Sequence, residues 1–156
     1  MIELLIQDAL AKCADDSPFW PGELVKELER RKRGLGLEWA LDSILRLLPS
    51  IQADAAAART LFDEATNHLR QGLPGEAAGE RGRAIWVSAH SRAVRRVFMR
   101  LFGAIAAFRL NQSQYFAEVF GTIAVACESL PLSEDPIPHV IESFRQLIAR
   151  DGTSIQ

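Results

Sequence analysis

Apolar residues recur along this chain at alternating steps of three and four, the spacing that places side chains on one side of an α-helix. The longest such segment runs from Glu80 to Leu110 without a proline. Its regularly spaced apolar positions are Val94, Phe98, Leu101, Ile105 and Phe108. We therefore expect one long amphipathic helix from Glu80 to Leu110, buried along this side and central to the fold.

Six further segments show the same spacing, and none alternates with the period of two that predicts a β-strand. They cover residues 2–13, 23–32, 37–48, 51–69, 116–130 and 140–152, separated by prolines, glycines and short polar runs. The turn Leu73-Pro74-Gly75 predicts that the fourth helix and the long helix run antiparallel. We expect residues 1–156 to form a single all-α domain, a helical bundle of about seven helices with residues 153–156 frayed.

Length and charge support one domain without a membrane segment. The chain has 156 residues, 48% of them hydrophobic, and a formal net charge of -2. Its N-terminus has no basic segment before the apolar residues, and no apolar run approaches the ~20 residues that cross a bilayer. The sequence predicts a cytoplasmic protein that does not bind membranes. The overall charge gives no sign of nucleic-acid binding.

Cysteine and histidine are sparse. Cys13 and Cys127 each continue the apolar side of a predicted helix, so we expect buried, reduced thiols, with a disulfide or a nucleophile as alternatives. The histidines are His68, His90 and His139, and their spacing matches no metal-binding motif. No phosphate-binding loop or nucleophile motif occurs. We therefore expect no metal and no cofactor.

Arginines form a stripe beside the apolar side of the long helix. Arg92, Arg95, Arg96 and Arg100 follow one another at steps of three, one and four residues, which groups them along one edge. Trp39 and Trp86 are expected in the core or at its edge, so the stripe lacks exposed aromatics for stacking on nucleic acid. Without a catalytic motif, the stripe favours a non-enzymatic protein whose partner binds these four arginines.

An enzymatic alternative rests on Arg83 and His90. Seven residues are close to two helical turns, so a continuous helix would place both side chains on one face. A guanidinium can hold a phosphate while an imidazole moves a proton, as metal-independent RNA cleavage requires. The spacing resembles the arginine–histidine signature of the α-helical HEPN ribonucleases. That resemblance implies a site in an open cleft, formed across a homodimer.

Three stretches between Leu37 and Arg96 resemble another family more broadly. They are Trp39-Ala40-Leu41-Asp42 leading to Leu48-Pro49, Leu69-Arg70-Gln71-Gly72, and Arg83-Ala84 leading to Ala89-His90-Ser91-Arg92. Together they resemble a helical family of immunity proteins from bacterial toxin systems. The resemblance implies a small bacterial protein that binds a cognate toxin and neutralises it without turnover. This is the leading hypothesis.

Overall fold

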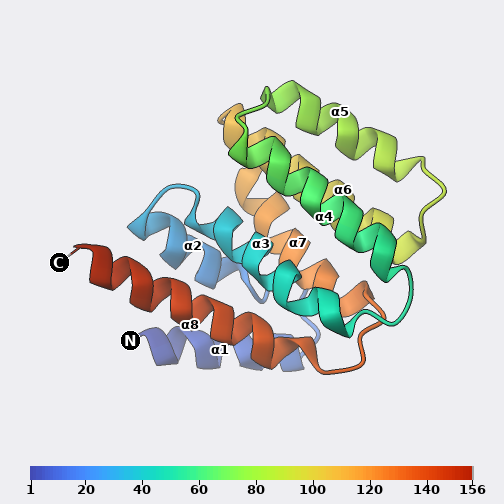
Figure 1. The fold of residues 1–156 in the computed structure, drawn as a ribbon. Coiled ribbons are helices and arrows are strands. Elements are labelled where there is room, and N and C mark those ends of the chain that lie inside the picture. The colour runs from blue at the N-terminus through green and yellow to red at the C-terminus, as the bar shows by residue number, and fades with distance from the viewer. Residues whose placement is uncertain (156) are drawn as a thin grey trace.

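The computed structural model describes residues 1–155, with the side chains of residues 1–151. It is all-helical, as predicted, and contains eight α-helices and one short 3-10 turn within that range (Figure 1). The elements are α1 (Ile2–Ala14), α2 (Gly22–Arg31), α3 (Leu35–Leu47), η1 (Leu48–Ser50), α4 (Ala55–Arg70), α5 (Gly75–Trp86), α6 (Arg92–Arg109), α7 (Tyr115–Ser129) and α8 (Pro136–Ile155). None of these helices has both the length and the hydrophobicity that a bilayer crossing requires.

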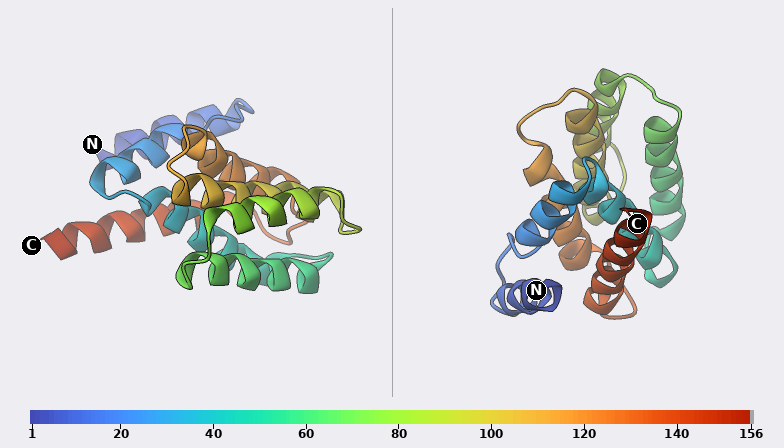
Figure 2. Two further views of the ribbon diagram at one scale, coloured as in Figure 1. Left: turned by 90° about the horizontal axis from the view of Figure 1, so that it is seen from above. Right: turned by 90° about the vertical axis from the view of Figure 1, so that its left-hand side faces the viewer.

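Two helices organise the packing. α6 packs against α4, α5 and α7, whereas α3 packs against α2, α7 and α8. Figure 1 shows α4, α5 and α6 on one side of the molecule, α1, α2 and α8 on the other, and α3 between them. The two views in Figure 2 place the N-terminus and the C-terminal end of α8 at the same end of the molecule. The buried side chains of the helices form one continuous apolar cluster.

The predicted single helix from Glu80 to Leu110 is wrong, because the chain leaves the helix after Trp86 and starts α6 at Arg92. Two serines account for the break. Ser88 Oγ donates to the carbonyl of Ile85 at 2.7 Å, and Ser91 Oγ caps α6 by accepting from the Val94 amide at 3.4 Å. Serine side chains compete with helical backbone hydrogen bonds and favour helix starts. α5 and α6 therefore form a hairpin instead of a rod.

The apolar positions predicted for this segment are nevertheless confirmed on α6. Val94, Phe98 and Leu101 have no exposed surface, and Ile105 is 1% exposed. Phe108 at the end of the helix is partly buried. A continuous helix and a hairpin bury the same positions of α6, because the three-four spacing depends only on the local helix.

The turn between α2 and α3 joins three helices. Gly34 adopts a left-handed φ of 93°, which glycine accepts without strain. The Glu29 carboxylate then accepts from the amides of Gly34 at 3.0 Å and Gly36 at 2.7 Å, and so caps the start of α3. From α7, the Tyr115 hydroxyl donates to Glu29 at 2.8 Å, and burial beside this carboxylate raises the pKa of Tyr115. Glu29 on α2 therefore caps α3 in place of a residue next to the helix start.

α8 lies against α3 through a buried contact. The Trp39 indole donates to the Val140 carbonyl at 2.9 Å, and its ring meets Phe144 edge to face. α8 continues to Ile155, beyond the end expected near Gly152, because one glycine weakens a helix by only about 1 kcal/mol. The helix thus includes Thr153 to Ile155, which we expected to fray, while Gln156 lies outside the described residues.

Candidate functional site

The chain between Glu80 and Glu118 contains seven arginines and no aspartate or glutamate. This segment forms the second half of α5, the following turn, α6 and the start of α7. Carboxylates for these arginines must therefore come from other parts of the fold. Arg81 pairs with Glu64 of α4 at 2.5 Å, whereas the nearest carboxylate oxygens to Arg96 and Arg100, from Glu128 and Glu118 of α7, are 3.9 Å away.

Three arginines near the α5–α6 turn have no carboxylate partner among the described side chains. The Arg95 guanidinium lies over the Trp86 ring, 5.8 Å from its centre, and donates to the Trp86 carbonyl at 3.2 Å. Its Nε is buried with no hydrogen-bond partner in the described part of the chain. Arg83 and Arg92 are exposed, and no ion pair joins either to another described residue.

Trp86 and Val87 lie among these arginines, with 49% and 81% of their surfaces exposed. Both tryptophans were expected in the core or at its edge: Trp39 is fully buried, whereas Trp86 is half-exposed. The buried positions of α5 that face α6 include Ala78, Gly82 and Ile85. Trp86 follows Ile85 by one residue, so its side chain points about 100° around the helix from that buried face.

We call the surface formed by Arg83, Trp86, Val87, Arg92 and Arg95 the turn patch. It combines a large exposed aromatic, an exposed aliphatic side chain and three cations without a carboxylate partner among residues 1–151. Stacking of Arg95 on Trp86 holds the indole in one orientation, which lowers the entropy lost when a partner covers it. The patch therefore combines apolar and cationic groups of the kinds that bind a partner surface.

A groove of about 630 Å³ lies beside the turn patch, between α5 and α7, with α6 at its base. Its base contains Gly79, Gly82 and Gly103, and its rim includes Arg83 and Trp86. Any side chain at position 103 would meet the Glu118 carboxylate from α7. The glycines thus lower the base of the groove and let Glu118 lie over α6.

Glu118 is the one described acid that lines this groove. Partial burial raises the pKa of Glu118, and the positive charge of Arg100 partly opposes that rise. The nearest atoms of the two side chains are 3.9 Å apart, so Arg100 compensates the carboxylate only weakly. The groove therefore has a cation at its rim and an incompletely compensated acid across from it.

The structure divides the predicted arginine stripe between two surfaces. Arg92 and Arg95 belong to the turn patch. Arg96 and Arg100 turn toward α7, where Arg96 donates to the Ser129 hydroxyl at 2.9 Å and Arg100 approaches Glu118. The four side chains do not form one free edge, and binding of a partner by all four stays a prediction.

The geometry assumed for the ribonuclease alternative is wrong. Arg83 lies on α5, but His90 lies in the turn after the helix has ended at Trp86. The His90 amide donates to Ser88 Oγ at 3.4 Å, within that turn. Arg83 lines the groove beside α7, whereas His90 is not among the residues that line it. A shared helix face therefore does not bring the two side chains together.

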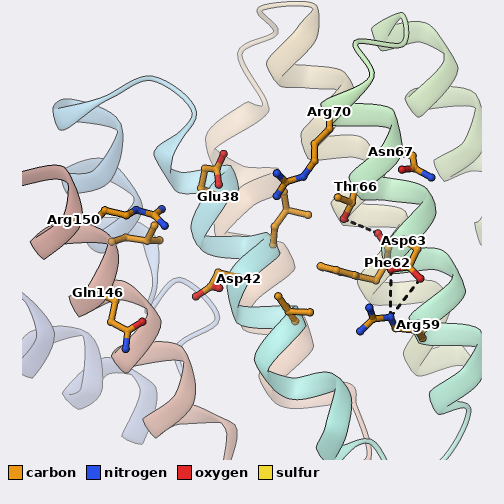
Figure 3. A pocket seen from close by; sticks show the side chains of 13 residues that line it. Glu38, Asp42, Arg59, Phe62, Asp63, Thr66, Asn67, Arg70, Gln146 and Arg150 are labelled. Carbon is orange, nitrogen blue, oxygen red and sulfur yellow. Dashed lines mark hydrogen bonds and ion pairs between the residues drawn. The ribbon is translucent and has the colours of Figure 1, made fainter. Parts of the chain in front are cut away.

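Another hollow, of about 860 Å³, lies on a different face, between α3, α4 and α8. Figure 3 shows Arg70 reaching in from α4 and Arg150 from α8, with Glu38 on α3 between them. Its charges are mixed. Arg59 pairs with Asp63 along α4 at 3.3 Å, and the Asp42 carboxylate accepts from Arg46 at 2.9 Å. We call this hollow the α3–α4–α8 groove.

Metal-binding side chains do not gather in the described part of the chain, where no group of three or more could hold an ion. His139 pairs with Glu134 at 2.8 Å. The His68 ring meets Phe102 edge to face, and its Nδ1 is buried without a hydrogen-bond partner among the described residues. These contacts place His68 and His139 on different sides of the fold.

The segments that resemble immunity proteins occupy three different places in the fold. Residues 39–42 lie in α3, residues 69–72 end α4, and residues 83–92 contain most of the turn patch. No family model, curated protein or solved structure matches this chain.

Proposed function

We propose that this protein is a non-catalytic binding domain of the immunity type, which uses the turn patch to hold an acidic surface of a toxin. One observation carries the proposal: Trp86 and Val87 are exposed, and the three arginines around them have no carboxylate partner among the described side chains. Binding would inhibit the toxin by covering a surface, without turnover.

The composition of the turn patch matches the residues that dominate protein interfaces. Tryptophan and arginine are enriched among the few side chains that supply most of the binding free energy, and truncating such a residue costs about 2 kcal/mol or more. Trp86 and Val87 supply apolar area to be buried. Arg83 and Arg92 surround it with positive charge, which raises the association rate with an acidic partner.

A protein partner is favoured over nucleic acid by the size of the cationic surface. Proteins that bind duplex DNA strongly through its backbone contact about 6–10 phosphates. The turn patch has three arginines and one exposed aromatic ring, and the chain carries a net charge of -2. Exposed Trp86 removes the earlier objection that no aromatic is available for stacking, so nucleic-acid binding is an outcome that the experiment must distinguish.

The resemblance supports the same surface independently of its exposure. Two of the five turn-patch residues, Arg83 and Arg92, are among the residues that carry the resemblance, and Trp86 and Val87 lie between them in the sequence. Arg95 lies one helical turn further along α6. The proposed binding surface therefore overlaps one of the three stretches that resemble the family.

The test requires a candidate toxin, which would be sought among the products of the neighbouring genes and produced with and without this protein in bacteria. We expect co-production to restore growth and the purified pair to form a complex. Trp86→Ala should weaken the dissociation constant about 30- to 100-fold and abolish the protection. Arg59→Glu on α4 is the matched control, because Arg59 is exposed but belongs to the α3–α4–α8 groove.

The control outcomes separate the alternatives. Equal binding by the wild type and the Trp86→Ala variant would remove the turn patch as the interface. Absence of both protection and complex formation would overturn the immunity function. RNA cleavage that disappears in a His90→Ala variant would instead support the ribonuclease, and RNA binding that depends on Trp86 without cleavage would support a nucleic-acid partner.

A further inference from the structure

The two cysteines, distant in sequence, line one pocket. Cys13 lies in the last turn of α1 and Cys127 lies in α7, and both line a pocket of about 490 Å³. Neither is bridged, and both are partly buried. Both thiols are free and partly buried against the core, and the fold brings them to one pocket.

The charges around this pocket are acidic. Asp16, Glu128 and Asp135 line it together with the two thiols. Burial, then Asp135, then Asp16 raise the pKa of the Cys13 thiol. For Cys127, burial, the neighbouring Cys13 and Asp135 raise the pKa to about 12. Cys13 thus lies close enough to Cys127 to raise the pKa of the Cys127 thiol.

The end of α1 is a place where a small movement is possible. Cys13 is the second-last residue of the helix, and the chain reverses at Asp16 with a φ of 60°. The backbone carbonyl of Cys13 accepts from the Asp16 amide at 3.0 Å within this turn. A disulfide requires Cα atoms about 4.4–6.8 Å apart, and a helix end adjusts to that distance more readily than a helix centre.

We propose that Cys13 and Cys127 are an oxidisable pair. Small cationic disulfides such as cystamine oxidise the two thiols to a reversible intramolecular disulfide. The proposal does not rest on the proposed function, because the pair lies on α1 and α7 rather than on the turn patch.

The reaction proceeds by two thiol–disulfide exchanges. The Cys13 thiol loses its proton to solvent, and its sulfur attacks one sulfur of the small disulfide, breaking that bond and releasing one small thiolate. The Cys127 sulfur, after losing its proton, attacks the Cys13 sulfur of the mixed disulfide and releases the second small thiolate. Both small thiolates take up protons. The protein loses two electrons, and the small disulfide gains them.

The burial of each thiol and the acidic side chains of the pocket determine which cysteine reacts first and which reagent is preferred. Cys127 has the stronger burial and the higher pKa, so Cys13 reacts first and Cys127 resolves the mixed disulfide. The acidic side chains attract a cationic disulfide and repel an anionic one. Cystamine should therefore react faster than oxidised glutathione, and high salt should reduce the difference.

The experiment treats the folded, full-length protein with cystamine and follows its mass. We expect the wild type to lose two hydrogens and to yield a reducible cross-linked peptide pair containing Cys13 and Cys127. The oxidised form should melt several degrees higher, because the bridge constrains the unfolded chain. Cys127→Ser should stop at a stable cysteamine adduct on Cys13, and Cys13→Ser should react far more slowly.

Other outcomes would overturn the proposal. One is an adduct on each cysteine with no intramolecular bridge, and a second is bridging only between two protein molecules. A third is reaction of both thiols only after unfolding in urea, which would show that the folded pocket does not admit the reagent. Equal or faster bridging with oxidised glutathione would overturn the assignment of a cationic reagent.

Discussion

The turn patch and the α3–α4–α8 groove differ in whether acidic side chains accompany their arginines. Among the residues that line the groove, three arginines lie with three acids, and Arg59 pairs with Asp63 along α4. In the turn patch, α5 and α6 supply three arginines and the whole segment from residue 81 to 117 contains no acid. The acids and arginines that line the groove are therefore equal in number, whereas the turn patch has three arginines and no acid.

Substitution of Gly82 should have the largest effect on stability, because it would displace the helices that form the turn patch and leave the α3–α4–α8 groove unchanged. A Cβ at position 82 would lie 3.3 Å from the Met99 carbonyl, so Gly82→Leu must separate α5 from α6. We expect a loss of about 3 kcal/mol in the free energy of unfolding, measured by denaturant titration. Gly79→Ala is the control, since its Cβ would make an ordinary 3.7 Å contact with Ala106. Equal losses in both variants would contradict the close α5–α6 contact at Gly82.

Asp42→Ala tests the groove side of the comparison. The Asp42 carboxylate accepts from Ser143 Oγ at 2.5 Å, and Ser143 is fully buried. Without Asp42, this hydroxyl loses its acceptor, which should destabilise the protein by about 1–2 kcal/mol in thermal or chemical unfolding. Asp63→Ala removes an exposed pair on α4 and should change stability by less than about 0.5 kcal/mol. If Asp63→Ala lowers the stability as much as Asp42→Ala, the buried hydrogen bond from Ser143 to Asp42 contributes no more than an exposed ion pair.

Charge reversal at Arg92 compares the two surfaces directly. Arg92→Glu should slow association with the acidic partner about tenfold at low salt, with little change at high salt and little change in stability. The paired Arg59→Glu variant should associate at the wild-type rate. Stopped-flow or surface-binding kinetics at two salt concentrations measure both. If the two variants slow association equally, overall charge and not the turn patch controls binding.

Glu118→Gln should give the smallest effect, a change in how stability depends on pH. The folded state raises the pKa of Glu118 above its ordinary value of 4.5. The folded protein therefore binds this proton more tightly than the unfolded chain does, so the stability contribution is present below pH 4.5 and is lost as pH rises through the folded-state pKa. Melting temperatures of the two proteins between pH 4 and pH 7 should diverge in favour of Glu118→Gln. Parallel curves would show that Arg100 compensates the carboxylate fully.

The helix break at residues 87–91 is a feature that the apolar spacing did not determine. Val94, Phe98 and Leu101 were placed correctly, because burial of a helix face leaves a local spacing in the sequence. The same spacing is compatible with one rod or with two packed helices. Ser88 and Ser91 were local signals for a break, but serine also occurs inside helices, so they became decisive only with α5 packed on α6.

The exposure of Trp86 and the shared pocket of Cys13 and Cys127 had no comparable signal in the sequence. Both depend on which helices pack together and at what angle. The acid-free segment around the patch, in contrast, was visible in the sequence, although its consequence depended on how far the carboxylates of α4 and α7 reach.

The sequence by itself determined an all-helical chain, the buried side of each main helix and the excess of arginine between residues 81 and 117. These properties are local, because three-four spacing and residue content do not depend on distant contacts. Tertiary structure alone decided which arginines found carboxylates, that Trp86 faces outward and that two distant thiols share one pocket. Such properties depend on distances between helices, and those distances follow from the packing of the whole core.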